Sequence, residues 1–525
     1  MLGAQAAAAV ACVALTGAAA AQTAPVLYVD RANAACSDSG SGTATQPFCT
    51  IGAAAAKVTA GQTVQVSTGT YSETVTVQSS GTSSAPITFT AAPGATVTLS
   101  GQTNGFAISS RSWVTVNGFT VTNTSDYGIA VSGSSHITLS KNHVSYAGQP
   151  VNGLTKYGIR LSNVTDSLVS GNVTDHNTNA GIGLVSSSTR NEVKGNESFA
   201  NAMQWQRAAA GIYVYASPGN TIDGNVLHDN EDSGINCFSG SNNCLIYNNV
   251  AYNNGDHGID NYQVTGSRII SNTVYDSVAA GIQVEASSTG ATIANNISVD
   301  NGINSPRTHS DIRVDSSSVS GTTMDYDLVW LTAADTLLIW NSESYTSLSA
   351  FKAATGQEAH GIQADPKWRN SAAADFHLLA GSPAIDSANA AASGEPAADL
   401  DGNARVDDPA TPNTGAGTPP YADRGAYEFQ PAPVDAAPAA RLSVGPSSGT
   451  APLAVTADAS ASTDTDPTPI ASYSFDFGDG SPVVGPQPGA TATHTYTAAG
   501  TFTVTVTVRD TAGLSSTARK KVKVK

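Results

Sequence analysis

A Gly-Ile pair followed by alternating polar and apolar residues recurs along the middle of the chain. The glycine of the pair falls at positions 128, 158, 181, 211, 234, 258 and 281, in steps of 30, 23, 30, 23, 24 and 23 residues. Alternation with a period of two indicates a strand with one buried face, so the Ile and the aliphatic residue two positions later should point inward. A unit of this length is too short to bury a core alone, so the units must stack.

A second ladder keeps the same spacing, formed by Asn142, Asn172, Asn196, Asn225, Asn249, Asn272 and Asn296. Stacked amides can bond from coil to coil at a turn, which favours a structural role over ligand binding. Short strands stacked coil upon coil predict an all-β chain whose main part is a right-handed parallel β-helix, a solenoid. The glycines ahead of the isoleucines fit two interpretations, the bare floor of an outer channel or turns with positive φ.

Composition and charge limit the kinds of binding partner and the cellular compartment that we expect for this protein. Only 12% of residues are charged and the formal net charge is −17, which argues against nucleic acid or an anionic membrane as the main partner. Residues 1–21 are typical of a signal peptide, and no later segment is apolar enough to span a bilayer. We therefore expect a secreted, extracellular protein, monomeric, with local disulfides Cys36/Cys49 and Cys237/Cys244.

Two resemblances set the domain boundaries. Residues 28–101, with "PFCTIGAAAAKVTAGQTVQVSTGTYSETV", resemble the opening segment of secreted family-nine polysaccharide lyases, which are pectate lyase-like β-helix proteins. The stretches "SYSFDFGDGSPVV" and "THTYTAAGTFTVTVTVRD" resemble a PKD domain, a small β-sandwich. We predict the following order: signal peptide 1–21, β-helix 22–430 (cap 22–101, coils 102–302, terminal segment 303–430), Pro/Ala linker 431–441 and PKD domain 442–525.

Acidic and amide side chains gather at the outward positions of two neighbouring coils. Asp232 and Asp256 stand two residues before the glycine, and Asn236 and Asp260 stand two residues after it. Equivalent positions on adjacent coils lie one strand spacing apart, so four oxygen-bearing side chains should converge. Such a set suits calcium.

The stretch "NNGDHGIDNY" at 253–262 also resembles the family-nine lyase pattern "NNSDDGWDLF", in which the aspartates bind calcium. The resemblance implies that Asp256 and Asp260 are ligands, with His257 in place of a third aspartate. The lysine base of the family would fall near Phe238, where this chain has no base. Elimination from a uronide needs a base for the C5 proton, so Arg207, Lys156 or His257 would have to supply it.

Aromatic and polar residues along the same face predict a groove for an extended sugar polymer. Two seven-residue insertions, in "YAGQPVNGLTK" and "NAMQWQRAA", should overhang this groove. The predicted substrate-binding residues are Arg160, Trp205, Tyr213, Tyr215, Tyr262 and Gln283.

These features predict an extracellular enzyme that cleaves an acidic, uronate-containing polysaccharide with the help of calcium. Two alternatives use the same residues. Aspartates on adjacent coils could be the acid and base of a glycoside hydrolase, or the chain could be a carbohydrate-binding or cell-surface β-helix protein without activity.

Overall fold

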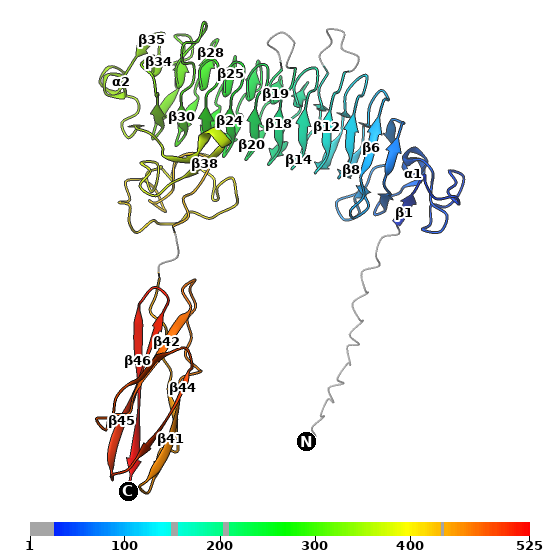
Figure 1. Cartoon of the computed structure of the whole chain (residues 1–525). Helices are drawn as coiled ribbons and strands as arrows, with labels where there is room; N and C mark the ends of the chain where they lie inside the picture. The colour runs from blue at the N-terminus through cyan, green and yellow to red at the C-terminus, as the bar shows by residue number, and fades with distance from the viewer. Residues whose placement is uncertain (1–25, 149–155, 203–208, 432–434) are drawn as a thin grey trace, which may run out of the picture. The chain divides into compact units, whose positions relative to one another are not determined.

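A computed structural model describes residues 26–148, 156–202, 209–431 and 435–525. The chain divides into two compact units, one that ends at Phe429 and one that runs from Gln430 to Lys525. The first unit is a parallel β-helix built from three long sheets, so the predicted all-β solenoid is confirmed (Figure 1). No helix in the described residues is long and apolar enough to cross a membrane.

Each coil contributes one strand to each sheet, and the sheets are numbered here in the order in which a coil visits them. Sheet 1 contains β4 (Val75–Val77), β7 (Phe106–Ser109), β10 (Ile129–Ser132), β13 (Ile159–Ser162), β16 (Ile182–Val185), β19 (Ile212–Tyr215), β22 (Ile235–Phe238), β25 (Ile259–Tyr262), β28 (Ile282–Glu285), β31 (Ile312–Val314), β34 (Leu338–Trp340) and the antiparallel β35 (Glu343–Tyr345). Sheet 2 contains β1 (Val26–Val29), β2 (Thr63–Val66), β5 (Ile87–Ala91), β8 (Ser112–Asn117), β11 (Ser135–Ser140), β14 (Leu168–Ser170), β17 (Glu192–Lys194), β20 (Thr221–Asp223), β23 (Leu245–Tyr247), β26 (Arg268–Ile270), β29 (Thr292–Ala294) and β32 (Thr323–Asp325). Sheet 3 contains β3 (Gly69–Tyr71), β6 (Val97–Ser100), β9 (Thr120–Thr122), β12 (His143–Ser145), β15 (Val173–Asp175), β18 (Glu197–Phe199), β21 (Val226–His228), β24 (Val250–Tyr252), β27 (Thr273–Tyr275), β30 (Ile297–Val299), β33 (Leu328–Trp330) and β36 (Ile362–Gln363).

The Gly-Ile repeat places its isoleucines in one stacked row inside sheet 1. Ile212 pairs with Ile235, which pairs with Ile259, which pairs with Ile282, and none of these side chains is exposed. Because every coil adds one such residue to each inner face, the core is continuous from coil to coil, as the period of two requires.

The asparagine ladder is structural, as predicted. Asn225 Nδ2 donates to Asn249 Oδ1 at 2.9 Å, and the main-chain N–H of Asn225 donates to the same oxygen at 2.9 Å. The ladder ends at Asp327, whose Oδ1 accepts from Asn296 Nδ2 at 2.8 Å. These buried bonds satisfy backbone groups at the turn between sheets 2 and 3.

The glycines of the Gly-Ile pairs fit neither predicted role. They are buried, and none is among the residues with positive φ. A Cβ atom on Gly258 would lie 2.2 Å from Val274 Cγ1, and one on Gly281 would lie 2.4 Å from Ser298 Oγ. The glycines are therefore required because the corner packs tightly against sheet 3, and they do not form the floor of a groove.

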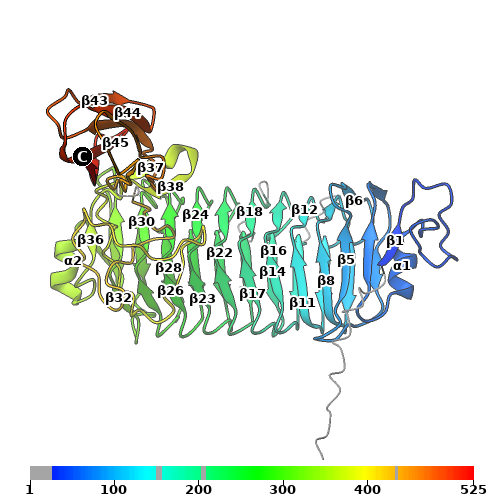
Figure 2. The same cartoon turned by 90° about the horizontal axis from the view of Figure 1, so that it is seen from below.

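Short helices cover the ends of the β-helix, and a terminal segment lies along its side. Helix α1 (Ile51–Lys57) follows its N-cap Thr50 and packs beside β4, and α2 (Leu348–Thr355) lies beside β34 and β35. The terminal segment, with β37 (Trp368–Asn370), η1 (Ser371–Ala373) and β38 (Asp375–Leu378), runs back over the later strands of sheets 2 and 3 (Figure 2).

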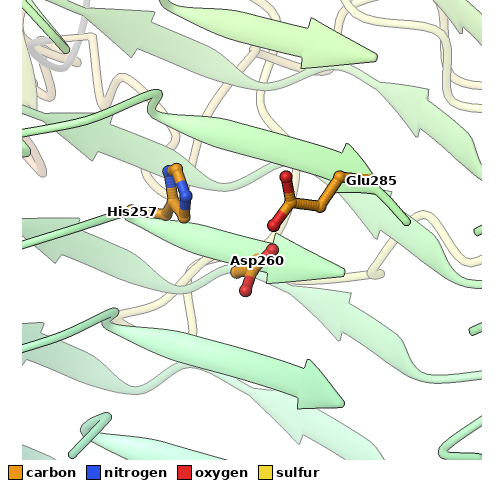
Figure 3. Close-up of side chains that lie close together, drawn as sticks. All are labelled: His257, Asp260 and Glu285. Carbon is orange, nitrogen blue, oxygen red and sulfur yellow. The ribbon is translucent and has the colours of Figure 1, made fainter. Parts of the chain in front are cut away.

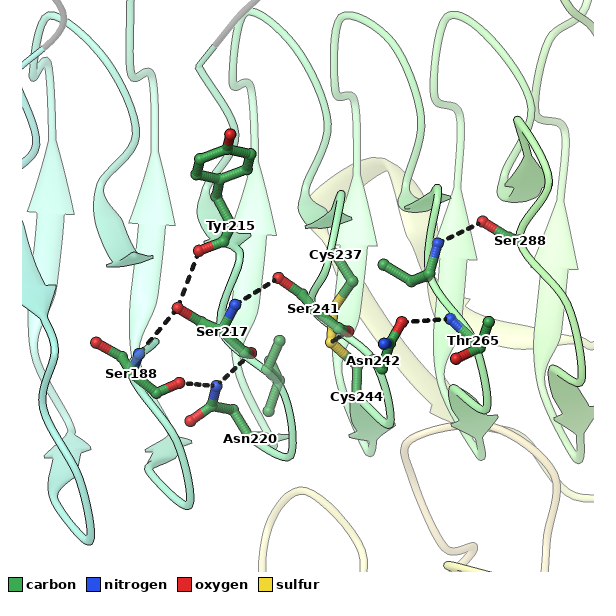
Figure 4. Close-up of a disulfide and its surroundings, with 12 residues drawn as sticks. Ser188, Tyr215, Ser217, Asn220, Cys237, Ser241, Asn242, Cys244, Thr265 and Ser288 are labelled. Atoms are coloured by element: carbon green, nitrogen blue, oxygen red, sulfur yellow. Dashed lines mark hydrogen bonds between the residues drawn. A yellow bond between two sulfur atoms is a disulfide. The ribbon is translucent and has the colours of Figure 1, made fainter. Parts of the chain in front are cut away.

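Both predicted disulfides are present, Cys36–Cys49 and Cys237–Cys244. The second pair lies inside the coils beside a ladder of serines, in which Ser188 N–H donates to Ser217 Oγ at 3.1 Å and Ser217 N–H donates to Ser241 Oγ at 3.2 Å (Figure 4). The disulfide therefore fixes the corner that follows β22.

The second unit is a small β-sandwich with its own core. Its strands are β39 (Ser443–Gly445), β40 (Ser448–Gly449), β41 (Leu453–Asp458), β42 (Ile470–Asp476), β43 (Val484–Gln487), β44 (Thr491–Tyr496), β45 (Gly500–Asp510) and β46 (Ser515–Val524). Part of the predicted linker 431–441 belongs to this unit, because Ala436 N–H donates to Asp466 Oδ2 at 2.7 Å and Ala440 N–H donates to Ser516 Oγ at 3.0 Å.

Candidate functional site

The outer face of sheet 1 brings the predicted polar side chains into register. Asn236 on β22 pairs with Asp260 on β25, which pairs with Gln283 on β28. In the same strands Tyr262 pairs with Glu285. Equivalent atoms on neighbouring strands are separated by about 4.8 Å, so the side chains of this row can share one ligand.

Three ligand-type side chains meet at the centre of this face, His257, Asp260 and Glu285. One ligand atom from each lies within 4.8 Å of the others (Figure 3). His257 is 4% exposed and Asp260 is 5% exposed, so both are almost enclosed. We call these residues together with Asp232 and Asp256 the acid cluster.

The hydrogen bonding of His257 defines its tautomer. Nδ1 lies 3.0 Å from the carbonyl oxygen of Ala280, and a carbonyl can only accept, so Nδ1 carries the hydrogen and Nε2 has the free lone pair in the neutral ring. Nε2 lies 3.6 Å from Asp256 Oδ1. Burial lowers the pKa of His257, although the charges of Asp256 and Glu285 oppose it. A neutral imidazole of this kind can accept a proton or bind a metal.

Negative charge is concentrated around Asp260. Burial raises the pKa of its carboxyl well above the usual value, and the charges of Glu285, Asp232 and Asp256 raise it further. Two arginines offset part of this charge. Arg307 Nη1 lies 3.0 Å from Asp256 Oδ1, and Arg313 Nη1 lies 3.1 Å from Glu285 Oε2.

The row also contains buried oxygen atoms without a hydrogen-bond partner, namely Asn236 Oδ1, Asp260 Oδ1 and Gln283 Oε1. Buried polar atoms are nearly always paired, so three oxygens on adjacent strands without a protein partner are available to bind a ligand or water. Carboxylate and amide oxygens are the ligands that calcium prefers. The residues present therefore fit the cation that the sequence resemblance implies.

Not all predicted site residues reach the acid cluster. Lys156 is held by Asp126 at 2.6 Å, and both Lys156 and Arg160 lie over the ring of Tyr127, at 4.9 and 5.0 Å. Arg160 lies on β13 and Lys156 lies just before it, and β13 is four strand spacings from β25, or about 19 Å. The hydrogen bond to Asp126 raises the pKa of Lys156, so the amine stays protonated. Lys156 is therefore not placed to act as a base here, and Arg207 and Trp205 lie outside the described residues.

The predicted aromatic row connects these two regions of sheet 1. Phe238 and Tyr262 stack with ring centres 4.6 Å apart, and Tyr213 lies 5.9 Å from Phe238 and 6.4 Å from Tyr157. Tyr215 is 43% exposed. A continuous row of rings beside a line of polar groups can bind an extended sugar chain through stacking and hydrogen bonds.

Sequence reasoning missed three residues of this site, Glu285, Arg307 and Arg313. Glu285 stands four residues after the glycine of its Gly-Ile pair, an outward position of the repeat, so the register alone could have identified it. Arg313 lies within β31, which is preceded by Asp311 where the other coils have glycine. Arg307 lies in a third long turn, between β30 and β31. Because this coil lacks the Gly-Ile pair, the repeat does not identify either arginine as an outward residue.

Comparisons with known proteins agree with this fold. The family model described as "Right handed beta helix region" matches residues 87–251 and 201–349, which together span just over half of the chain, so the chain belongs to this family. The model "Pel9A-like, right handed beta helix region" matches residues 28–140, and a PKD domain model matches residues 435–524.

The individual proteins that resemble this chain have low sequence identity to it. The uncharacterized protein YwoF of Bacillus subtilis is 28% identical over 422 residues, which cover 66% of this chain and 90% of YwoF. The crystal structure of pectate lyase Pel9A is similar with 19% identity, a TM-score of 0.46, and coverage of 78% of this chain and 97% of that chain. The complex of XylC with xylose is similar with 12% identity, a TM-score of 0.45, and coverage of 58% and 76%.

Proposed function

We propose that this protein is an exported enzyme that cleaves an acidic, uronate-containing polysaccharide by calcium-assisted β-elimination. The observation that carries the proposal is the acid cluster, in which His257, Asp260 and Glu285 meet within 4.8 Å beside unpaired buried oxygens. The Pel9A-like match over residues 28–140 supports the same class. Two disulfides suit an oxidising compartment outside the cytoplasm.

In this proposal Asp232, Asn236, Asp256, Asp260 and Glu285 supply the calcium ligands. Calcium bound there would neutralise the uronate carboxylate and so make the C5 hydrogen more acidic. Arg307 and Arg313 lie at the edge of the same cluster and add positive charge for the substrate carboxylate. The aromatic row of Tyr213, Tyr215 and Tyr262 binds the neighbouring sugar units.

The proton acceptor in this proposal is His257. Its Nδ1–H is held by Ala280, which leaves the Nε2 lone pair directed at the acid cluster, and its lowered pKa keeps the ring neutral near pH 7. Lys156 is unsuitable because it stays protonated beside Asp126. A base within reach of the acidified hydrogen contributes about 10²- to 10⁴-fold to the rate.

The test is a panel of polyuronates and neutral glycans, assayed with calcium and with a chelator. We expect unsaturated products, detected by ultraviolet absorbance, from a polyuronate with calcium and none with chelator. Asp260→Asn should abolish calcium binding and product. Asp276→Asn is an acidic control, because Asp276 lies in the same coil but follows β27 in sheet 3. His257→Gln should lower kcat about 10²-fold or more while calcium still binds. Loss of calcium binding in His257→Gln would make His257 a ligand instead.

A glycoside hydrolase is the second candidate, and one observation favours it. Asp260 and Glu285 carry oxygens within 4.8 Å, Asp260 is kept protonated by its surroundings, and Glu285 is paired with Arg313. A protonated and an ionised carboxyl close together are the usual pair of retaining glycosidases. New reducing ends without unsaturated product, and without a calcium requirement, would establish this alternative.

A further inference from the structure

A second groove lies on sheet 2, away from the acid cluster. It has a volume of about 560 Å³ and is formed by side chains from five successive coils, with Thr115, Thr138 and Leu168 among its lining residues. This volume is in the usual range of ligand sites, roughly 300–1,000 Å³. The terminal segment covers the later strands of sheet 2 through Ser393 and Glu395 and leaves the face of β8, β11, β14 and β17 open (Figure 2).

One wall of the groove is a column of residues at the corner where the chain enters sheet 2, with Trp113 and His136 at the start of β8 and β11. Trp113, His136, Asp166 and Arg190 each follow one of the residues Ser112, Ser135, Thr165 and Thr189, which pair from coil to coil. The rings of Trp113 and His136 stack with centres 4.0 Å apart and an angle of 17°. Nδ1 of His136 is buried and has no hydrogen-bond partner.

The backbone at this corner is left-handed in every coil of the column. Trp113 has φ of 59°, His136 55°, Asp166 54° and Arg190 56°. The next coils place Gly219, Asn243, Gly266 and Gly290 at the same corner, also with positive φ. Gly and Asn adopt this conformation easily, whereas a bulky ring does so at a cost of about 1–2 kcal/mol. A tryptophan and a histidine held there against this preference indicate that their side chains are needed.

The charges of the groove define what it can bind. Arg190 is the only Lys or Arg among its lining residues, and Asp166 already holds it through two contacts of 2.7 Å. Glu192 lies 3.6 Å from Lys194. A polyuronate would therefore find no unpaired cation among the described lining residues. Hydroxyl groups, in contrast, can donate to the fixed carboxylates of Asp166 and Glu192 while a sugar ring packs on the indole.

We propose that this groove is a second carbohydrate-binding site, which takes an uncharged, hydroxyl-rich stretch of polysaccharide against Trp113. Its column from Trp113 to Arg190 covers about three strand spacings, or on the order of 14 Å, along the axis of the β-helix. The site is independent of the acid cluster and of the reaction proposed there. It would hold neutral chains, such as the side branches of an acidic polymer, while sheet 1 acts on uronate units.

The test measures binding of the full chain carrying Asp260→Asn, so that no cleavage occurs. Affinity gel electrophoresis with galactan, arabinan, xylan and glucomannan is compared with polygalacturonate, both with chelator present. Trp113→Asn and Arg190→Gly use residue types that the same corner accepts in later coils, so both variants should fold. Tyr146→Asn is the matched control. Tyr146 is exposed and, like Trp113, has a positive φ (53°) and stacks on a histidine, with its ring centre 5.0 Å from that of His176.

We expect at least one neutral glycan to bind and Trp113→Asn to weaken its binding about five- to tenfold, with Tyr146→Asn within about twofold of the parent. Arg190→Gly should weaken binding as well, because Asp166 loses the group that positions it. No binding of any neutral glycan by the parent would overturn the proposal. Equal losses in Trp113→Asn and Tyr146→Asn, or a Trp113 effect on polygalacturonate alone, would also overturn it.

Discussion

At the scale of single residues, the candidate site is a place where buried acidic side chains are concentrated. Asp260 is 5% exposed, and the charges of Glu285, Asp232 and Asp256 raise the pKa of its carboxyl while the charge of Arg313 lowers it. An ionised carboxylate in this position destabilises the fold unless a cation binds. The site therefore links cation binding to stability.

We predict that calcium raises the Tm of the wild-type protein at pH 8 by a few degrees. A calcium concentration of 100 times Kd stabilises the folded state by roughly 2.7 kcal/mol, which corresponds to a shift of this size. Asp260→Asn should have a higher Tm than wild type in chelator, because the buried charge is removed, and should show no calcium shift. Differential scanning calorimetry measures both effects. A calcium shift that persists in Asp260→Asn would place the cation elsewhere.

A second prediction at this scale concerns the aromatic row. Tyr215→Ala should raise KM about five- to tenfold with kcat nearly unchanged, because the 43% exposed ring contacts sugar units away from the bond that breaks. Steady-state kinetics on the best polymer gives both parameters. A drop in kcat with constant KM would instead place Tyr215 at the reacting unit.

At the scale of structural elements, the turns between strands depend on ladders of buried amides. Asn225 Nδ2 donates to Asn249 Oδ1, to the carbonyl oxygen of Val193 at 2.9 Å and to that of Asp223 at 3.1 Å. Removal of this side chain leaves acceptors in two neighbouring coils without their donor. The effect is large because water cannot reach these groups.

We predict that Asn225→Ala lowers the free energy of unfolding by on the order of 3 kcal/mol in urea titrations. Asn370→Ala is the control, since Asn370 is exposed and makes no side-chain cap bond, and it should stay within about 0.5 kcal/mol. Similar values for the two variants would show that the ladder does not stabilise the coils.

The last coils contain a buried acidic pair, Asp327 and Glu358, next to Arg424. Burial raises the pKa of Asp327 to about 6 and raises the pKa of Glu358 well above its usual value, with the charge of Asp327 adding to the latter shift. Arg424 donates to the carbonyl oxygen of Asp327 at 3.0 Å. One carboxylate balances the guanidinium, so the second carboxyl is most stable when protonated.

Both carboxyl groups have a higher pKa in the folded state than in the unfolded state, so the folded protein binds their protons more tightly. Their contribution to stability is therefore complete below about pH 4 and is lost as the pH rises through about 6. Glu358→Gln should therefore match wild type at pH 4.5 and exceed its stability by on the order of 2 kcal/mol at pH 8. Thermal unfolding across this range, with the exposed Glu343→Gln as control, is the measurement. A pH-independent difference would contradict the assignment.

At the scale of the whole molecule, the two units have separate cores. The β-helix core and the sandwich core share no residue, and the division falls between Phe429 and Gln430. The acid cluster and the groove on sheet 2 are both built from the first unit alone. Every described residue that we assign to these two sites therefore belongs to the first unit.

A chain that ends at Phe429 should fold and keep kcat on a soluble polymer within about twofold of the full chain, because every residue proposed for the reaction remains. Circular dichroism and the same kinetic assay test this. Loss of kcat with intact folding would mean that the second unit takes part in the reaction.

The amino-acid sequence by itself was sufficient for the architecture and for half of the candidate site. A repeat of about 23 residues determines which side chains point inward, so the sheets, the asparagine ladder and the row of Asn236 and Asp260 could be predicted. Both disulfides followed from cysteine spacing.

Contacts that do not follow the repeat were decided only by the tertiary structure. Arg307 reaches Asp256 from a turn 51 residues later in the chain, and Glu285 meets His257 across two strands. The repeated glycines fit neither of the two roles expected from the sequence, because their role is a close approach to sheet 3, which no local pattern reveals. The groove at Trp113 likewise exists only when corners of four coils align. Periodicity fixes the direction of a side chain, but distances between turns depend on how the coils stack in space.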